Sequence, residues 1–187
     1  MKQLAAWILS LMELLAPPEK RVTETTLRMG GETVEQMKER YKQFANDMAE
    51  VVLVNPVFTT GKYAEYRSAA QMLGVAFMES GFRKDVDVGP CRKGECDKGN
   101  SFCSMQIQTG IAGKSPEGWK GQELLEDRKK CFMSGANALR RSYGACGNLS
   151  SYTVGHCEKD EPKAKARQAI GERLFARLPI PKSEGSE

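Results

Sequence analysis

The sequence is poor in histidine and in aromatic residues, and it lacks a long apolar run. Histidine occurs once, at His156, so a metal site built from several histidines is excluded. Aromatic residues make up 7%, so Leu, Met, Ala and Val must form most of the core. The apolar stretch Leu4–Leu15 is too short to span a bilayer. These absences, together with the length of 187 residues, favour one compact domain with a short appendage and no stable transmembrane span.

A strong excess of either charge is also missing. The formal net charge of +4 and the pI of ≈ 8.7 are mildly basic. A nucleic-acid-binding domain has a more concentrated basic field, so no nucleic-acid partner is expected. An anionic polymer such as a cell wall would suit this charge, and an ordinary solvated surface explains it without any partner.

The cysteines are confined to one part of the chain, at Cys91, Cys96, Cys103, Cys131, Cys146 and Cys157. An even, clustered set favours disulfides and therefore an oxidising compartment. The paired C-x-x-C spacing of structural zinc sites is absent, so disulfides are favoured over zinc, and no metal or other cofactor is expected. The pairing is left open, because six cysteines can be connected in many ways.

Residues 1–32 differ in character from the rest of the sequence. Leu4–Leu15 fits the apolar core of a signal peptide, and it equally fits an amphipathic helix of the mature protein. Residues 19–32 are polar and contain two adjacent glycines, which predicts a linker or turn. We expect an N-terminal helix or signal-like segment with a linker over 1–32, a main domain over 33–180 and a flexible tail over 181–187.

Helical periodicity dominates the main domain. Helices are predicted over about residues 34–53, 63–80, 121–143 (with a break near residue 130), 149–154 and 162–178. Thr33 is the expected N-cap of the first of these helices, and Gly81 is expected to end the second. Residues 83–104 lack periodicity and predict a long loop or a small irregular sheet stapled by disulfides. The fold class is therefore mostly α, with a small irregular or β element.

Two groups of charged residues are interpreted as solvated. Asp85 and Asp87 lie in the loop and could suggest calcium, but the EF-hand pattern is absent. The last helix is expected to bury a face that includes Ala166, Ile170 and Leu174. Its basic residues are then expected to face solvent, at Lys163, Lys165, Arg167, Arg173 and Arg177.

Glu79 is the candidate catalytic residue. It lies near the end of an apolar helix, where apolar neighbours and the negative end of the helix dipole would raise the pKa of a carboxyl group. A glutamic acid that stays protonated near neutral pH can donate a proton to the leaving oxygen of a glycoside. The alternative is an ordinary solvated glutamate at a helix C-terminus.

Four blocks of sequence resemble the goose-type lysozyme and lytic transglycosylase superfamily. The first, Glu79-Ser80-Gly81-Phe82, is similar to the family's Glu-Ser motif. The second covers residues 97–107 (Asp-Lys-Gly-Asn-Ser-Phe-Cys-Ser-Met-Gln-Ile), the third 135–140 (Gly-Ala-Asn-Ala-Leu-Arg) and the fourth 149–155 (Leu-Ser-Ser-Tyr-Thr-Val-Gly). The blocks occur in the family's order, and the resemblance covers about residues 65–178.

The resemblance implies a lysozyme-like α+β fold and cleavage of the β-1,4 bond between N-acetylmuramic acid and N-acetylglucosamine in peptidoglycan glycan strands. Glu79 would protonate the glycosidic oxygen, and Tyr152 would orient Glu79. The substrate-binding residues would be Ser80, Met105, Gln106, Ile107 and Tyr152. The resemblance also implies that peptidoglycan glycan strands are the partner, so the protein would act in the periplasm or outside the cell, after export or after delivery by a phage or a secretion system.

Departures from the family pattern bear on whether water takes part. Asp97 matches the motif's Asp and would be the second catalytic residue, the base of a hydrolytic lysozyme. A lytic transglycosylase needs no water, because a hydroxyl of the muramic acid closes an anhydro ring. Gln108 stands where goose-type enzymes have a further carboxylate, which favours the transglycosylase. Cys103, Ser104 and Thr153 replace the family's Gly, Leu and Asn.

Other functions stay open from the sequence alone. The chain could be a catalytically silent module that binds glycan strands, or an effector that uses the loop over 83–104 as its contact surface. A thiol hydrolase would need one free cysteine beside His156. Retention of Glu79 favours the glycan-cleaving enzyme, because a binding module gains nothing from an acid at that place. Nothing in the sequence indicates an oligomeric state.

Overall fold

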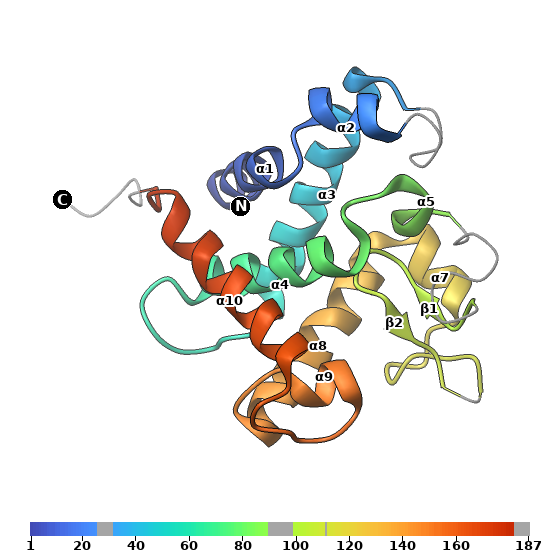
Figure 1. Cartoon of the computed structure of the whole chain (residues 1–187), viewed down its shortest axis with the longest axis vertical. Helices are drawn as coiled ribbons and strands as arrows, with labels where there is room; N and C mark the ends of the chain where they lie inside the picture. Colours follow the sequence, from blue (N-terminus) through green and yellow to red (C-terminus); the bar gives the residue numbers. More distant parts are fainter. Residues whose placement is uncertain (26–31, 90–98, 111, 182–187) are drawn as a thin grey trace.

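The computed structural model describes residues 1–25, 32–89, 99–110 and 112–181, and these are mostly helical with one small sheet (Figure 1). The elements are α1 (Lys2–Leu15), α2 (Pro18–Thr25), α3 (Val34–Val54), α4 (Ala64–Ser80), α5 (Lys84–Asp87), β1 (Ser101–Phe102), β2 (Ile107–Gln108), α7 (Gly121–Glu126), α8 (Arg128–Cys146), α9 (Ser150–Val154) and α10 (Pro162–Arg177). The predicted fold class, mostly α with a small β element and disulfides, is confirmed. None of the helices in the described ranges combines the length and the hydrophobicity needed to cross a bilayer.

Helix α1 packs its apolar face into the main core. Trp7, Ile8 and Leu11 are buried against α3 and α4, and the Trp7 ring packs edge-on against Tyr66. The face that is buried is the one expected for an amphipathic helix. The linker expected over 19–32 is wrong in its first part, because Pro18–Thr25 forms α2. A proline at the first helical position, followed by an acidic residue in the first turn, favours a helix start there.

The ends of α3 and α4 follow from local residue chemistry. Thr33 caps α3 through a reciprocal pair of hydrogen bonds with Gln36, as the sequence predicted for Thr33. Gly81 ends α4 in the left-handed conformation with φ 58°, a conformation that glycine adopts without a steric cost. Helix α4 is buried almost all round from Tyr66 to Ala76. It therefore forms the centre of the molecule, and Glu79 lies on its last turn.

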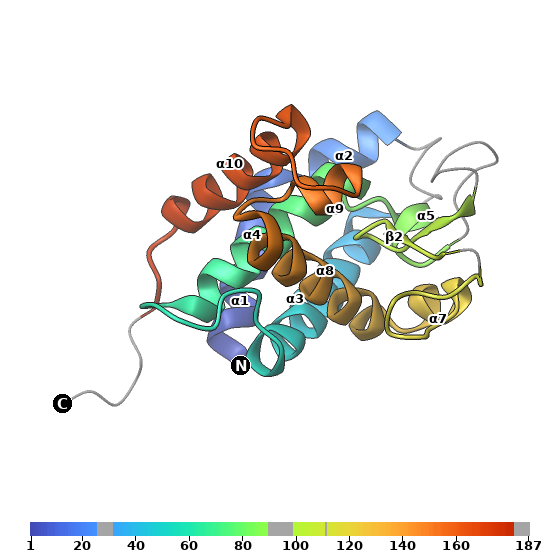
Figure 2. The same cartoon turned by 90° about the horizontal axis from the view of Figure 1, so that it is seen from below.

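Helix α10 crosses α4 at very short range (Figures 1 and 2). A Cβ added to Gly74 would lie 2.9 Å from Ile170 and 3.0 Å from the Gly171 nitrogen. A Cβ added to Gly171 would lie 2.7 Å from the Gln71 side chain. The Gln71 amide spans the crossing, because it donates to the Arg167 carbonyl at 2.9 Å and accepts from the Tyr143 hydroxyl at 2.9 Å. This contact fixes α10 beside the end of α4.

A two-stranded antiparallel hairpin forms the small β element of the fold. Phe102 of β1 pairs with Ile107 of β2. In both views the hairpin and α7 lie together at the end of the molecule away from the C-terminal end of α10 (Figures 1 and 2). Gly121 at the start of α7 packs directly on the Phe102 ring, where a Cβ would lie 2.2 Å from the ring. The small β element is therefore held by a close contact with a helix as well as by its own two pairs.

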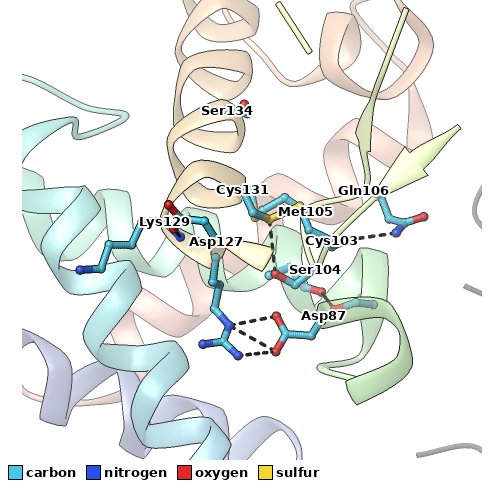
Figure 3. The surroundings of a disulfide bond; sticks show 12 residues. Asp87, Cys103, Ser104, Met105, Gln106, Asp127, Lys129, Cys131 and Ser134 are labelled. Carbon is cyan, nitrogen blue, oxygen red and sulfur yellow. Dashed lines mark hydrogen bonds and ion pairs between the residues drawn. A yellow bond between two sulfur atoms is a disulfide. The ribbon is translucent and has the colours of Figure 1, made fainter. Parts of the chain in front are cut away.

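Among the described residues, two disulfides link the hairpin, α8 and the segment after α9. Cys103, in the turn between the two strands, is bonded to Cys131 of α8 (Figure 3), and Cys146 at the end of α8 is bonded to Cys157 after α9. These four cysteines are used in disulfides and are not available as zinc ligands. Cys91 and Cys96 lie outside the described residues. The helix break expected near residue 130 falls at Asp127, whose side chain accepts from the Lys129 amide and caps α8.

Candidate active site

An open cleft of ≈ 510 Å³ lies between the hairpin, α8, α9 and α10, with the end of α4 at its base. Its lining comes from segments far apart in the sequence: Glu79, Gln106, Ile107, Gln108, Pro116, Ser134, Ala138, Arg141, Ala145, Ser151, Tyr152, Thr153, Lys163 and Arg167. Of the predicted site residues, the fold therefore brings Glu79, Gln106, Ile107 and Tyr152 to one surface. Asp97 lies outside the described residues.

Glu79 is paired with an arginine. The Arg167 Nε and Nη2 atoms each lie 2.7 Å from the Glu79 Oε1 atom, and the side chains are only 17% (Glu79) and 13% (Arg167) exposed. An opposite charge at this distance favours the ionised carboxylate. This contact acts against the apolar and dipolar effects that led us to expect a neutral carboxyl group.

Arg167 was expected to face solvent, and that expectation is wrong. Of the face expected to be buried, Ile170 and Leu174 are buried and Ala166 is exposed, and the observed inner face also contains Ala164 and Gly171. Arg167 lies on the same side as Ala164 and Gly171, at the helical spacings of three and four residues. Gly171 lets α10 approach α4 closely, and this approach brings the Arg167 guanidinium to Glu79.

Tyr152 contacts the hairpin through its hydroxyl group, which donates to the Met105 carbonyl at 2.6 Å. Burial raises the pKa of Tyr152 well above its ordinary value of 10.0; the nearby Glu79 charge raises it further, and Arg167 opposes the shift. The phenol therefore stays neutral in any physiological condition. Its single proton is committed to Met105, so Tyr152 holds the hairpin turn beside Glu79.

Met105 and Gln106 have different surroundings although they are adjacent. Met105 is fully buried, and its side chain packs against Gly135, where a Cβ would lie 2.6 Å from the methionine methyl group. Gln106 lines the cleft with a left-handed backbone, φ 48°, and its amide nitrogen donates to the Cys103 carbonyl at 3.0 Å. Figure 3 shows these residues around the disulfide. Met105 thus anchors the turn, and Gln106 and Ile107 are presented to the cleft.

Ser80 closes the end of α4. Its hydroxyl donates to the Ala76 carbonyl at 2.7 Å and accepts from the Phe82 amide at 3.1 Å. The side chain is buried, 5% exposed for the residue, and it is not among the lining residues. Its contacts are those of a residue that shapes the turn after Glu79.

The segment after α4 is anchored by a buried ionic network. Asp87, expected as a solvated loop charge, is 1% exposed, which makes that expectation wrong. Its carboxylate accepts from Arg128 at 2.9 Å and from Arg40 at 3.5 Å, and Arg40 also donates to the Phe82 carbonyl at 3.0 Å. The two arginine partners compensate the charge of this buried carboxylate. Asp85 makes an ion pair with Arg83.

A second carboxylate, that of Glu117, contacts Ser134 and Arg141, which line the cleft. It accepts from Ser134 at 2.6 Å, from Asn137 at 3.2 Å and from Arg141 at 3.3 Å. Desolvation by burial raises the pKa of Glu117, but hydrogen bonds from Ser134, Asn137, its own backbone and Ser115 outweigh it, and the net pKa lies below the ordinary value of 4.5. A carboxylate with this many donors is an anchor for the loop before α7, and it is poorly suited to accept a proton. Sequence reasoning gave no reason to single it out.

Comparison with known proteins does not assign a function to this cleft. No family model, curated protein or solved structure matches this chain. In the described ranges, no group of histidine, cysteine and acidic side chains is placed to hold a metal ion. His156 is exposed and contacts the Val154 carbonyl and Glu158. The function is therefore argued from the cleft and from the four sequence blocks.

Proposed function

We propose that the protein cleaves the β-1,4 bond between N-acetylmuramic acid and N-acetylglucosamine in peptidoglycan, as a lytic transglycosylase with Glu79 as its acid and base. The observation that carries the proposal is the meeting of the four sequence blocks at one cleft. Glu79 comes from the first block, Gln106 and Ile107 from the second, Ala138 from the third and Tyr152 from the fourth.

The second block contacts both the third and the fourth block directly. Gly135 of the third block leaves room for Met105 of the second, and Tyr152 of the fourth donates to the Met105 carbonyl. A chance similarity in four separate segments would not require that they pack on one another. These contacts therefore support the resemblance.

In the proposed reaction, the neutral carboxyl group of Glu79 gives its proton to the glycosidic oxygen as the bond from that oxygen to C1 of muramic acid breaks. The N-acetylglucosamine end leaves as an alcohol, and positive charge develops at C1. The C6 hydroxyl of the same muramic acid then attacks C1 and passes its proton to the Glu79 carboxylate. The anhydro ring closes, and the acid is regenerated without a water molecule.

Gln108 supports the transglycosylase over a hydrolytic lysozyme. It lines the cleft, and it carries an amide at the place where the goose-type pattern has a carboxylate. An amide cannot take a proton from an attacking water molecule. A hydrolytic reaction would have to use Asp97, and the ring-closing reaction needs neither residue.

Arg167 suits one half of the proposed reaction and opposes the other. It stabilises the Glu79 carboxylate that exists after proton donation and that serves as the base for ring closure. It disfavours the neutral acid that starts the reaction. We therefore expect the activity to be highest at acidic pH, where the carboxyl group is protonated in a larger share of the molecules.

The test is Glu79→Gln, which keeps the size of the side chain and removes its ability to donate a proton. Release of soluble fragments from purified cell walls should fall by a factor of at least about 100, the usual contribution of a general acid. Glu13→Gln, at an exposed glutamate of α1, is the matched control and should retain full activity. Equal activity of Glu79→Gln and the wild-type protein would refute the role of Glu79.

A further inference from the structure

A second hollow of the molecule, the α1–α10 groove, lies between the end of α1 and the second half of α10. It has a volume of ≈ 330 Å³ and is lined by Leu14, Leu15, Ile170, Arg173, Leu174 and Arg177. It shares no lining residue with the cleft, whose α10 residues, Lys163 and Arg167, come earlier in the helix. Figure 1 shows that α10 runs from the side of α9 towards the C-terminus, so the groove and the cleft lie along different halves of this helix.

The part of α10 that lines the groove carries two parallel stripes, one apolar and one cationic. Ile170 and Leu174 are four positions apart and so lie on one face of the helix. The same spacing places Arg173 and Arg177 along a neighbouring line. The apolar stripe is buried and forms the floor of the groove, whereas both arginines are exposed. From α1, Leu14 forms an apolar wall that is 51% exposed.

The two arginines keep most of their capacity to bind an anion. Within the described ranges neither of them makes an ion pair, and Arg173 uses its Nε atom, which donates to the Ala169 carbonyl at 3.3 Å. Glu172, the acidic residue next to Arg173, lines a different pocket, together with Phe58 and Phe175. The groove therefore offers an apolar floor beside two positive charges.

We propose that the α1–α10 groove binds an acidic amphipathic helix of another protein. Apolar side chains one turn apart on such a helix fill the groove over the apolar stripe, and acidic side chains beside them pair with the cationic stripe. The volume of the groove is at the lower end of the range for small-ligand sites, so it suits a few side chains of a single helix. This interaction surface is separate from the reaction proposed at Glu79.

Shape and charge favour this occupant over three others. A lipid surface takes up apolar residues that protrude, whereas Ile170 and Leu174 lie on the floor of a groove. A second copy of this chain in a symmetric contact would bring the same groove, and therefore like charges, together. Residues 182–187, which follow in the sequence, include two glutamates but no apolar side chain, so they cannot fill the floor.

The experiment measures the binding of labelled peptides to the whole protein by fluorescence anisotropy. The first peptide is a helix of about 18 residues with leucines along one face and glutamates beside them. A second peptide has lysine in place of each glutamate, and a third has the composition of the first in scrambled order.

The protein variants change exposed residues and should unfold at the wild-type temperature. Arg173→Glu/Arg177→Glu reverses the cationic stripe, and Leu14→Gln removes the apolar wall. The matched control is Lys2→Glu/Lys165→Glu, which makes the same change in net charge at positions outside the groove.

The acidic peptide should bind the wild type and the control variant equally, and the scrambled peptide should not bind. Reversal of the two arginines should raise the Kd of the acidic peptide by about tenfold or more at low ionic strength, and it should make the lysine peptide the better ligand. Leu14→Gln should raise the Kd of the acidic peptide by at least about threefold, because apolar contact area is lost.

Other results would overturn the proposal. Among them are equal binding of the acidic and the lysine peptide, unchanged binding in the reversal variant, and no binding of the acidic peptide. Cosedimentation with phosphatidylglycerol vesicles in place of peptide binding, lost in the reversal variant, would assign the groove to a lipid surface. Self-association that is lost in the same variant, measured by sedimentation, would assign it to a second copy of the chain. Because binding is the readout, the result does not depend on whether the protein cleaves glycan strands.

Discussion

The contact between Glu79 and Arg167 joins two residues 88 positions apart, and it places an opposite charge against the candidate acid. Glu79 could be singled out from the sequence, because its motif and its position at the end of an apolar helix are local features. Arg167 could not be singled out in the same way. Its role depends on which face of α10 meets α4, and Ile170 and Gly171 lie at that crossing. The predicted apolar face included Ala166, which is exposed, and so turned Arg167 towards solvent.

Removal of the Arg167 charge should change the pH dependence of cleavage. In Arg167→Gln the neutral form of Glu79 is no longer disfavoured by a cation, so the loss of activity on the alkaline side should occur at a higher pH than in the wild type. Among the described residues, Tyr152 of α9 interacts electrostatically with Glu79 and Lys163 of α10 lines the same cleft, and neither is altered in this variant. The profile of kcat/KM against pH measures the shift. Arg173→Gln, on an exposed part of the same helix, should leave the profile in place, and a wild-type profile in Arg167→Gln would contradict the account.

Glu117 should contribute stability that depends on pH. The pKa of Glu117 is lowered in the folded protein from the ordinary value of 4.5. The ionised group therefore stabilises the fold above that value, and the contribution is lost as the pH falls through the folded-state pKa. Glu117→Gln should lower the thermal unfolding midpoint at neutral pH, and the difference from the wild type should shrink at about pH 3. A difference that stays constant across this range would show that proton binding at Glu117 plays no part.

At the scale of elements, most helices were predictable because their start and stop signals are local. Thr33 and Gly81 mark the ends of α3 and α4, and Asp127 separates α7 from α8. The exceptions have a common cause. The helical turn over α5 and the burial of Asp87 depend on Arg40 and Arg128, which come from distant parts of the sequence. Periodicity within a segment carries no information about such partners.

The crossing of α4 and α10 should tolerate no added methyl group. Gly171→Ala would place a Cβ 2.7 Å from Gln71 and should destabilise the fold by about 1–3 kcal/mol, the usual cost of overpacking. It should also reduce cleavage, because α10 carries Arg167 and Lys163 to the cleft. Gly144→Ala is the matched control: Gly144 is exposed on α8, and no described atom lies within 4 Å of the added Cβ. That variant should be neutral or more stable by up to about 1 kcal/mol. Denaturant unfolding measures both, and equal stability of the two variants would contradict the close crossing.

At the scale of the whole molecule, the disulfides connect the parts that form the cleft. Cys103–Cys131 joins the hairpin to α8, and Cys146–Cys157 closes the segment that contains α9. The sequence predicted disulfides from the even, clustered cysteines but could not give their pairing. The pairing depends on the hairpin turn lying against α8, and that arrangement arises only in the folded chain. Disulfides at these positions favour an oxidising compartment.

Loss of the hairpin disulfide should cost more stability than loss of the shorter one. The sequence separations are 28 for Cys103–Cys131 and 11 for Cys146–Cys157, and a longer closed loop restricts the unfolded chain more. Replacement of both cysteines by alanine should lower the free energy of unfolding by about 3–4 kcal/mol for the first pair and by about 3 kcal/mol for the second. Denaturant unfolding of the two double variants, side by side with the wild type, measures the order. The reverse order would mean that the loop-closure argument does not apply to this fold.

The chemistry of the products tests the central claim most directly. Purified peptidoglycan is digested with the wild-type protein and with Glu79→Gln, and the soluble fragments are analysed by mass spectrometry. The account predicts fragments that end in anhydromuramic acid, one water lighter than hydrolytic products, from the wild type and none from Glu79→Gln. Reducing ends in place of anhydro ends would replace the ring-closing step with hydrolysis and point to Asp97. The absence of any fragments from the folded, oxidised wild-type protein would contradict the claim that this cleft cleaves glycan strands.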